Sequence, residues 1–103
     1  MEHDKPVTVY FVSRHPGARE WAATEGLAVD EFIPHLDITR VRAGDVAIGS
    51  LPVNLAAEVC AHGARYRHLS LDLPADARGM ELTAEAMRRH GVRLEEFWVE
   101  RVQ

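Results

Sequence analysis

The stretch that decides the fold is Val7-Thr8-Val9-Tyr10-Phe11-Val12-Ser13-Arg14-His15-Pro16-Gly17-Ala18. Its apolar first half is typical of a parallel strand that is buried on both faces. Its polar second half ends in Pro16, a residue that suits the first turn of a helix. Ligands bind open α/β sheets at the carboxyl ends of the strands. The sequence therefore predicts a candidate site at Ser13, Arg14 and His15.

The composition is that of one soluble domain. The chain has 103 residues, of which 47% are hydrophobic and 27% charged, with a formal net charge of −4. This length is enough for a single core. A weakly acidic chain lacks the broad basic face that a long nucleic acid requires, although a few local donors suffice for a small anion. We expect a polar tail over residues 1–6 and a single domain over residues 7–103.

Cysteine usage and hydropathy indicate a cytoplasmic protein. The single cysteine, Cys60, leaves no internal disulfide and suits a reducing compartment. The beginning of the sequence, residues 1–5, lacks the apolar core of a signal peptide. No apolar run approaches the roughly 20 residues of a membrane span. We therefore expect cytoplasmic localisation and no membrane partner.

Alternating strand-like and helix-like segments predict an α/β domain. The expected strands cover residues 7–13, 29–36, 45–50, 65–73 and 92–102, and the expected helices cover residues 16–25, 52–62 and 83–90. This alternation implies right-handed crossovers and a mostly parallel sheet between two layers of helices, a small Rossmann-like three-layer domain. The last strand can join as an antiparallel edge. Its alternation slips at Glu95-Glu96, which predicts a β-bulge or a bend.

The first candidate site combines three kinds of polar group. Ser13 offers a hydroxyl, Arg14 a guanidinium that matches phosphate geometry, and His15 a titratable imidazole. A helix that starts at Pro16 adds free N–H groups and a positive dipole end. Together these groups suit an anionic ligand, phosphate above all. The alternative is that Ser13 only caps the turn, while Arg14 and His15 are solvated.

Gly49-Ser50-Leu51-Pro52 repeats this arrangement after the third expected strand. Gly49 permits close backbone approach, Ser50 can donate a hydrogen bond, and Pro52 opens another helix. Asn54, in the first turn of that helix, could contact a ligand held at Ser50. Taken alone, these residues also fit an ordinary turn and an exposed polar side chain. Two such turns on adjacent strands would flank one crevice.

His35 and Asp37 flank Leu36, so a strand would place both side chains on one face. They predict either a His–carboxylate pair that tunes an acid or a base, or a surface hydrogen-bonded pair. No second cluster shows metal-ligand spacing, so we expect neither a metal nor another cofactor. Three further histidines are interpreted as structural or solvated: His62, His68 and His90.

Motifs of several common enzyme classes are absent from the sequence. It has no Walker phosphate loop, no G-x-G-x-x-G, no G-x-S-x-G and no Cys-x-x-Cys. Their absence argues against dinucleotide dehydrogenase, serine hydrolase and zinc-finger functions.

Five groups of residues together carry a family resemblance: Phe11–Ala18 with Glu20-Trp21, His35–Asp37, Gly49–Cys60, Leu71–Pro74, and Arg78-Gly79-x-Glu81-Leu82. Over these motifs the chain resembles the Csx-sixteen family, short ancillary proteins of type III CRISPR systems. The resemblance extends over nearly the whole chain, residues 7–102. It implies a Rossmann-like fold related to CARF domains, the sensors of cyclic oligoadenylates, and a homodimer.

The resemblance also implies a metal-independent ring nuclease. Such an enzyme binds and cleaves cyclic tetra-adenylate, the second messenger of type III complexes, and so switches off this antiviral signalling. A ribose 2′-OH would attack its own 3′-phosphate, which gives linear oligoadenylates with a 2′,3′-cyclic phosphate. The catalytic residues would be Arg14, which stabilises charge, and His15 or Ser13, which assists proton movement. The ligand-binding residues would be Gly49, Ser50, Leu51, Pro52, Asn54, His35, Asp37 and Arg78.

Two other classes of function remain open. A sensor or sponge would bind a cyclic oligoadenylate without cutting it, and it would use the same residue types. A structural subunit of a larger complex is suggested by the aromatic residues Phe97 and Trp98 near the C-terminus. The preferred ring size and the proton-transfer residue are also open.

Overall fold

The computed structural model of the chain describes residues 7–77 and 81–103. In these residues the order of elements is β1 (Val9–Val12), α1 (Pro16–Thr24), β2 (Glu31–Ile33), the 3₁₀ helix η1 (Ile38–Arg40), β3 (Val46–Gly49), α2 (Val53–Ala61), β4 (Arg65–Ser70), the 3₁₀ helix η2 (Ala75–Ala77), α3 (Ala84–Arg89) and β5 (Arg93–Phe97). Each strand and helix predicted from the sequence is present. The strands are shorter than predicted.

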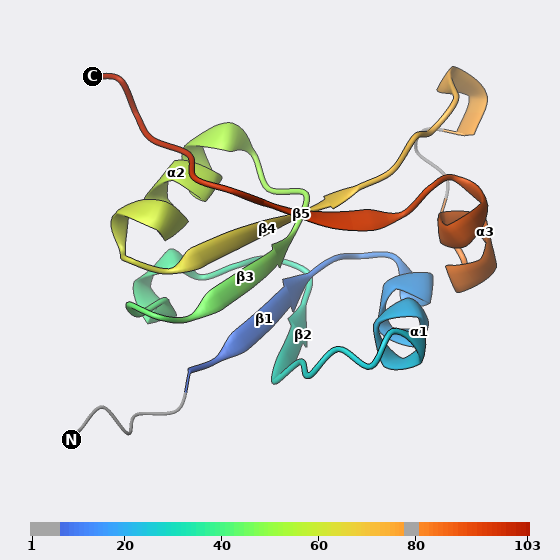
Figure 1. The fold of residues 1–103 in the computed structure, drawn as a ribbon, viewed down its shortest axis with the longest axis horizontal. Coiled ribbons are helices and arrows are strands. Elements are labelled where there is room, and N and C mark those ends of the chain that lie inside the picture. The colour runs from blue at the N-terminus through green and yellow to red at the C-terminus, as the bar shows by residue number, and fades with distance from the viewer. Residues whose placement is uncertain (1–6, 78–80) are drawn as a thin grey trace.

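The strands form one sheet in the order β2-β1-β3-β4-β5. β1 pairs in parallel with β2 and β3, and β3 pairs in parallel with β4. β5 joins β4 antiparallel, as the outermost strand (Figure 1). The predicted α/β class, with its mostly parallel sheet and antiparallel C-terminal edge, is confirmed. Because the chain goes from β1 outward to β2 and then returns past β1 to β3, its winding reverses between β1 and β3.

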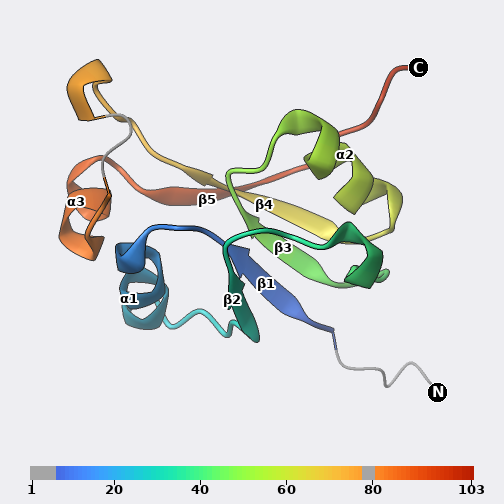
Figure 2. The same cartoon turned by 180° about the vertical axis from the view of Figure 1, so that it is seen from behind.

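Helices cover both faces of this sheet (Figures 1 and 2). α1 and α3 lie side by side on one face, over a core that includes Phe11 and Ile48. α2 and η1 lie on the opposite face, over a core that includes Tyr10 and Ala47. Successive residues of β1 and β3 thus point into different cores. This explains why both strands are apolar on both faces.

The helix boundaries follow local sequence signals. Pro16 occupies the first turn of α1, where its missing N–H costs nothing. Gly26 follows the end of that helix with a φ of 70°, a conformation that favours glycine. Thr83 caps α3, because its Oγ1 accepts a hydrogen bond of 3.0 Å from the backbone N–H of Ala86.

The predicted β-bulge or bend at Glu95-Glu96 is wrong. β5 pairs with β4 in an unbroken register and ends at Phe97, well before Val102. The alternation fails for another reason: β5 is an edge strand, and edge strands carry charges that discourage pairing with other chains. Glu96 forms a 2.7 Å salt bridge with Arg65 of β4. This partner holds the pKa of Glu96 below its usual value.

Replacing Gly17 with alanine is expected to destabilise the protein. A Cβ at Gly17 would lie 2.4 Å from the carbonyl oxygen of Leu82, where α1 meets the start of α3. In an ordinary helix this change stabilises by about 1 kcal/mol, whereas here we expect a loss of about 3 kcal/mol from overpacking. Urea unfolding measures the difference.

Gly26→Ala is the matched control. Its added methyl would have no atom within 4 Å, so only the left-handed backbone is strained, at a cost of roughly 1–2 kcal/mol. A Gly17→Ala variant as stable as the wild type would contradict the described packing of α1 against α3.

Candidate functional site

The ends of β1 and β3 lie side by side because Val12 pairs with Gly49. A Cβ at Gly49 would lie 2.6 Å from the carbonyl oxygen of Val12, so only glycine permits this approach. The two predicted helix-start turns, Ser13-Arg14-His15 and Ser50-Leu51-Pro52, are therefore adjacent. They follow the two strands between which the winding reverses, the usual place for a ligand in such folds.

Both turns line one open cavity of about 910 Å³. This volume lies in the range of about 300–1,000 Å³ that is typical of small-molecule sites. The segment after β2 adds His35, β4 adds His68, and Glu81 comes from the segment before α3. Several of the residues that line the cavity are leucines, so part of its surface is apolar. The cavity thus combines apolar leucine side chains with polar side chains from several segments of the chain.

Of the predicted site residues that the structure describes, three do not line this cavity. Gly49 is buried at the end of β3, where its role is the close approach to Val12. Asn54 lines a groove on α2 together with residues of the C-terminal segment. Arg78 lies outside the described residues.

Asp37, the third, does not pair with His35. Its carboxylate caps η1, where Oδ1 accepts hydrogen bonds from the N–H of Thr39 at 3.1 Å and from its Oγ1 at 2.6 Å. These bonds lower the pKa of Asp37. The expectation of a shared strand face fails because β2 ends at Ile33, before either residue.

Hydrogen bonds fix the first turn. Ser13 Oγ accepts from the backbone N–H of His15 at 3.0 Å, as the capping alternative predicts. His15 Nδ1 accepts from the backbone N–H of Leu82 at 3.3 Å. Arg14 is exposed, and within residues 7–77 and 81–103 its guanidinium makes no hydrogen bond or ion pair. Arg14 is therefore available to an anion in the cavity.

Tyr66 of β4 fixes the second turn through hydrogen bonds of its hydroxyl. Its hydroxyl donates to the carbonyl oxygen of Gly49 at 3.1 Å and accepts from the N–H of Leu51 at 3.0 Å. Burial raises the pKa of Tyr66, so this hydroxyl keeps its proton. Ser50 Oγ donates to the carbonyl oxygen of Leu69 at 2.7 Å and ties the same turn to β4.

His68 was interpreted from the sequence as structural or solvated, but it lines the cavity. It pairs with Gly49 in the sheet register, which brings it beside the second turn. Its Nδ1 lies 2.5 Å from the hydroxyl of Tyr66. The sequence did contain one signal, since Tyr66 and His68 are two residues apart and share a strand face.

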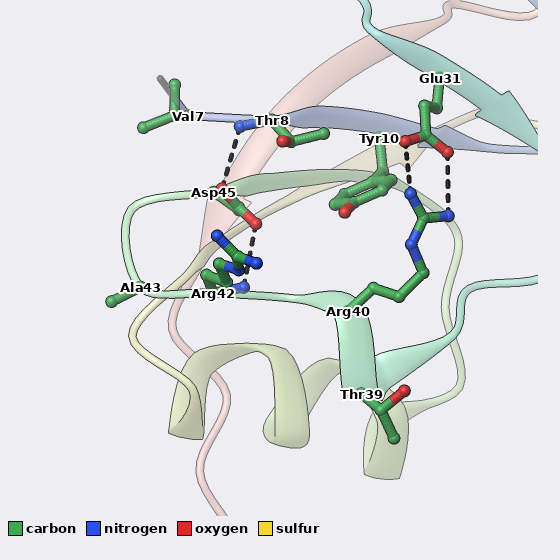
Figure 3. A pocket seen from close by; sticks show the side chains of 9 residues that line it. All are labelled: Val7, Thr8, Tyr10, Glu31, Thr39, Arg40, Arg42, Ala43 and Asp45. Atoms are coloured by element: carbon green, nitrogen blue, oxygen red, sulfur yellow. Dashed lines mark hydrogen bonds and ion pairs between the residues drawn. The ribbon is translucent and has the colours of Figure 1, made fainter. Parts of the chain in front are cut away.

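A second cavity, of about 450 Å³, lies at the opposite, amino-terminal edge of the sheet (Figure 3). Three of its four charged side chains, Glu31, Arg40 and Asp45, have hydrogen-bond partners, and the fourth is Arg42. Arg40 forms two hydrogen bonds with Glu31, at 2.7 and 3.1 Å. The buried Asp45 accepts from the backbone N–H groups of Thr8 and Arg42, both at 2.9 Å. Two carboxylates, Glu31 and Asp45, line this cavity and only Glu81 lines the cavity beside Arg14, so this edge is less suited to an anion.

The described residues hold no group of three or more His, Cys, Asp and Glu side chains placed to bind a metal ion. Among the helices of this part of the chain, none has the length and apolar character needed to cross a membrane.

Removing the hydroxyl of Tyr66 is expected to weaken the second turn. Tyr66→Phe leaves the N–H of Leu51 and the carbonyl of Gly49 without this partner, so we expect a loss of about 1–2 kcal/mol in urea unfolding. Tyr10→Phe is the matched control, because Tyr10 is equally buried and its hydroxyl makes no hydrogen bond in the described structure. Equal losses in the two variants would contradict this role of Tyr66.

Comparison with known proteins agrees with the CRISPR association. The family model described as "Putative CRISPR-associated protein (Cas_VVA1548)" matches residues 10–100. This span includes both turns that line the cavity. No curated protein and no solved structure matches the chain. The chain belongs to the Cas_VVA1548 family of CRISPR-associated proteins.

Proposed function

We propose that the cavity between the ends of β1 and β3 binds cyclic tetra-adenylate and cleaves it, and that the protein is a metal-independent ring nuclease that switches off type III CRISPR signalling. Membership of a CRISPR-associated family supports the biological setting. The resemblance to the Csx-sixteen family suggests the substrate. The observation that carries the proposal is that two helix starts and an exposed arginine open into one cavity.

Both helix starts are suited to phosphate. α1 and α2 are nine residues long, and neither has a side-chain cap hydrogen bond or an acidic residue in its first turn. At the start of α1, Gly17 and Ala18 already donate to the carbonyl oxygens of Leu82 and His15, whereas the first three N–H groups of α2 have no partner in the described residues. The N–H groups of α2 and the positive dipole ends of both helices therefore attract an anion. Arg14 adds a guanidinium, which can bind a phosphate with two parallel hydrogen bonds. These three sources of positive charge act in a chain whose net charge is negative.

The proposed reaction requires mainly positioning and charge stabilisation. A ribose 2′-OH held in line with its own 3′-phosphate attacks the phosphorus, and negative charge develops on the phosphate oxygens. Arg14 and the first N–H groups of α2 would stabilise that charge. The products are linear oligoadenylates that end in a 2′,3′-cyclic phosphate.

A homodimer is part of the same proposal. A ring of four equivalent nucleotides has even symmetry, so a two-fold dimer can present the same residues to both halves. A groove between α2 and the C-terminal segment leaves Val53 and Trp98 exposed, at 73% and 69%. Val53 is the first residue of α2, directly after Pro52, which lines the cavity. Pairing through this groove would bring two cavities near each other.

The activity is tested with purified protein in EDTA. We expect cyclic tetra-adenylate to be converted to linear products, and Arg14→Ala to lower the rate about 100-fold or more because a charge-stabilising donor is lost. Arg89→Ala, on an exposed position of α3, is the control and should keep the wild-type rate. Product analysis after incubation with cyclic oligoadenylates of several sizes also gives the preferred ring.

Three results would reject parts of this proposal. Full activity in Arg14→Ala would contradict the site assignment. Tight binding without product over many hours would indicate the sponge. No affinity for any cyclic oligoadenylate would favour the structural subunit, for which the exposed Phe97 and Trp98 are also suited.

The dimer is tested by light scattering. We expect the wild type at twice the chain mass of 11.5 kDa, and Trp98→Arg at the mass of one chain, because a charge would enter the apolar groove. Val102→Arg is the control, since Val102 is 98% exposed and does not line the groove. A wild type that stays monomeric as its concentration rises would contradict the dimer.

A further inference from the structure

The hydroxyl of Tyr66 has three hydrogen-bonding neighbours and only one proton. The N–H of Leu51 can only donate to it, and the carbonyl oxygen of Gly49 can only accept from it. Tyr66 therefore donates its hydroxyl proton to the carbonyl oxygen of Gly49. The third neighbour is Nδ1 of His68, which lies 2.5 Å from the tyrosine oxygen. Because the tyrosine proton is donated to Gly49, this oxygen can only accept a hydrogen bond from Nδ1. All three contacts are satisfied only when Nδ1 of His68 carries a proton and donates it.

This assignment fixes the tautomer of His68. A neutral imidazole that donates from Nδ1 has its lone pair on Nε2. The ring is also held in place by edge contacts, with centroids 5.7 Å from that of Tyr66 and 5.9 Å from that of Phe97. The side chain is half-buried and lines the cavity, so a bound ligand can reach it. An oriented imidazole with a lone pair on Nε2 has what a general base needs.

His15, in the same cavity, is held in the opposite tautomer. The backbone N–H of Leu82 donates to its Nδ1, so the neutral ring has its proton on Nε2. In that state Nε2 carries the proton and donates a hydrogen bond, and the lone pair on Nδ1 is occupied by the N–H of Leu82, so neither nitrogen is free to take a substrate proton. Ser13 Oγ is occupied as an acceptor by the N–H of His15. Neither of the proton-transfer candidates from the sequence is therefore well placed to act as the base.

We propose that His68 is the general base of the ring-cleaving reaction, that Tyr66 is its positioning residue, and that His15 donates a hydrogen bond to the reacting phosphate. This inference rests on the proposed ring-nuclease function and names the group that takes the substrate proton. The carboxylate of Glu81 also lines the cavity, but an imidazole titrates nearer to neutral pH and is the more effective base there.

Each proton and each bond in the cleavage step is accounted for. Nε2 of His68 takes the proton of the ribose 2′-OH, and the 2′-oxygen forms a bond to the phosphorus of its own 3′-phosphate. The bond from that phosphorus to the 5′-oxygen of the next nucleotide breaks. The departing 5′-oxygen takes a proton from solvent water, and the hydroxide that remains is neutralised by the proton held on His68.

The tautomers are tested without any substrate. Nitrogen-15 NMR of the histidine rings in the free wild-type protein, at a pH where they are neutral, is expected to show the proton of His68 on Nδ1 and that of His15 on Nε2. In Tyr66→Phe the preference of His68 for Nδ1–H should be lost, while His15 is unchanged. A wild-type His68 with its proton on Nε2 would overturn the inference.

The catalytic role is tested by single-turnover cleavage of cyclic tetra-adenylate. We expect His68→Asn to lower the cleavage rate about 100-fold to 10,000-fold, the usual contribution of a general base, with ring affinity changed by only a few-fold. Tyr66→Phe should lower the rate less than His68→Asn does, with a loss of affinity from the weakened second turn. His62→Asn is the matched control, because Nδ1 of His62 contacts the carbonyl oxygen of Val41, away from the cavity.

The two proposals fail in different ways. If the wild type leaves the ring intact, the ring-nuclease function fails, and the role of His68 as its base fails with it. If the wild type cleaves the ring and His68→Asn cleaves it at the same rate, only the inference about His68 is overturned. A stable His68→Asn variant that binds the ring but does not cleave it supports both proposals.

Discussion

The parallel pairing of β1 with β3 is the constraint on which the rest of the structure depends. Val12 meets Gly49 at the end of these strands, and the backbones come so close that a Cβ at Gly49 would collide with the Val12 carbonyl. Because the winding reverses at this pair, α1 covers one face of the sheet and α2 the other. Both helices start at the same edge of the sheet because each follows one of these two parallel strands. The cavity exists because these two starts are neighbours in space.

The hydroxyl of Tyr66 connects this architecture to the chemistry that we propose. The ring of Tyr66 packs in the core beneath α2, and its hydroxyl supports the turn after β3. The same oxygen is the partner of Nδ1 of His68. One side chain thus stabilises a turn that lines the cavity and contacts the base that we propose. Positive charge comes from other sources, the exposed Arg14 and the two helix starts, so that binding and proton transfer rest on separate groups.

Much of the fold could be predicted because its signals are local. Pro16 and Thr83 mark helix starts through their own backbone and side-chain chemistry, and apolar runs mark the strands. The two polar turns were predicted for the same reason, since they directly follow strands. The prediction failed where a local pattern had another cause. Asp37 serves η1 rather than His35, and the slip at Glu95-Glu96 reflects an exposed edge instead of a bulge.

By itself the sequence determined the order and type of the elements, the polar groups at the strand ends and, through its motifs, the association with CRISPR systems. Only the tertiary structure decided which turns meet and which groups lie beside Nδ1 of His15 and Nδ1 of His68. The reason is the sequence separation of the contacts: Leu51 and Tyr66 are 15 residues apart, and His15 and Leu82 are 67 apart. A hydrogen bond between such distant residues depends on how the strands pair, and no local pattern encodes that pairing.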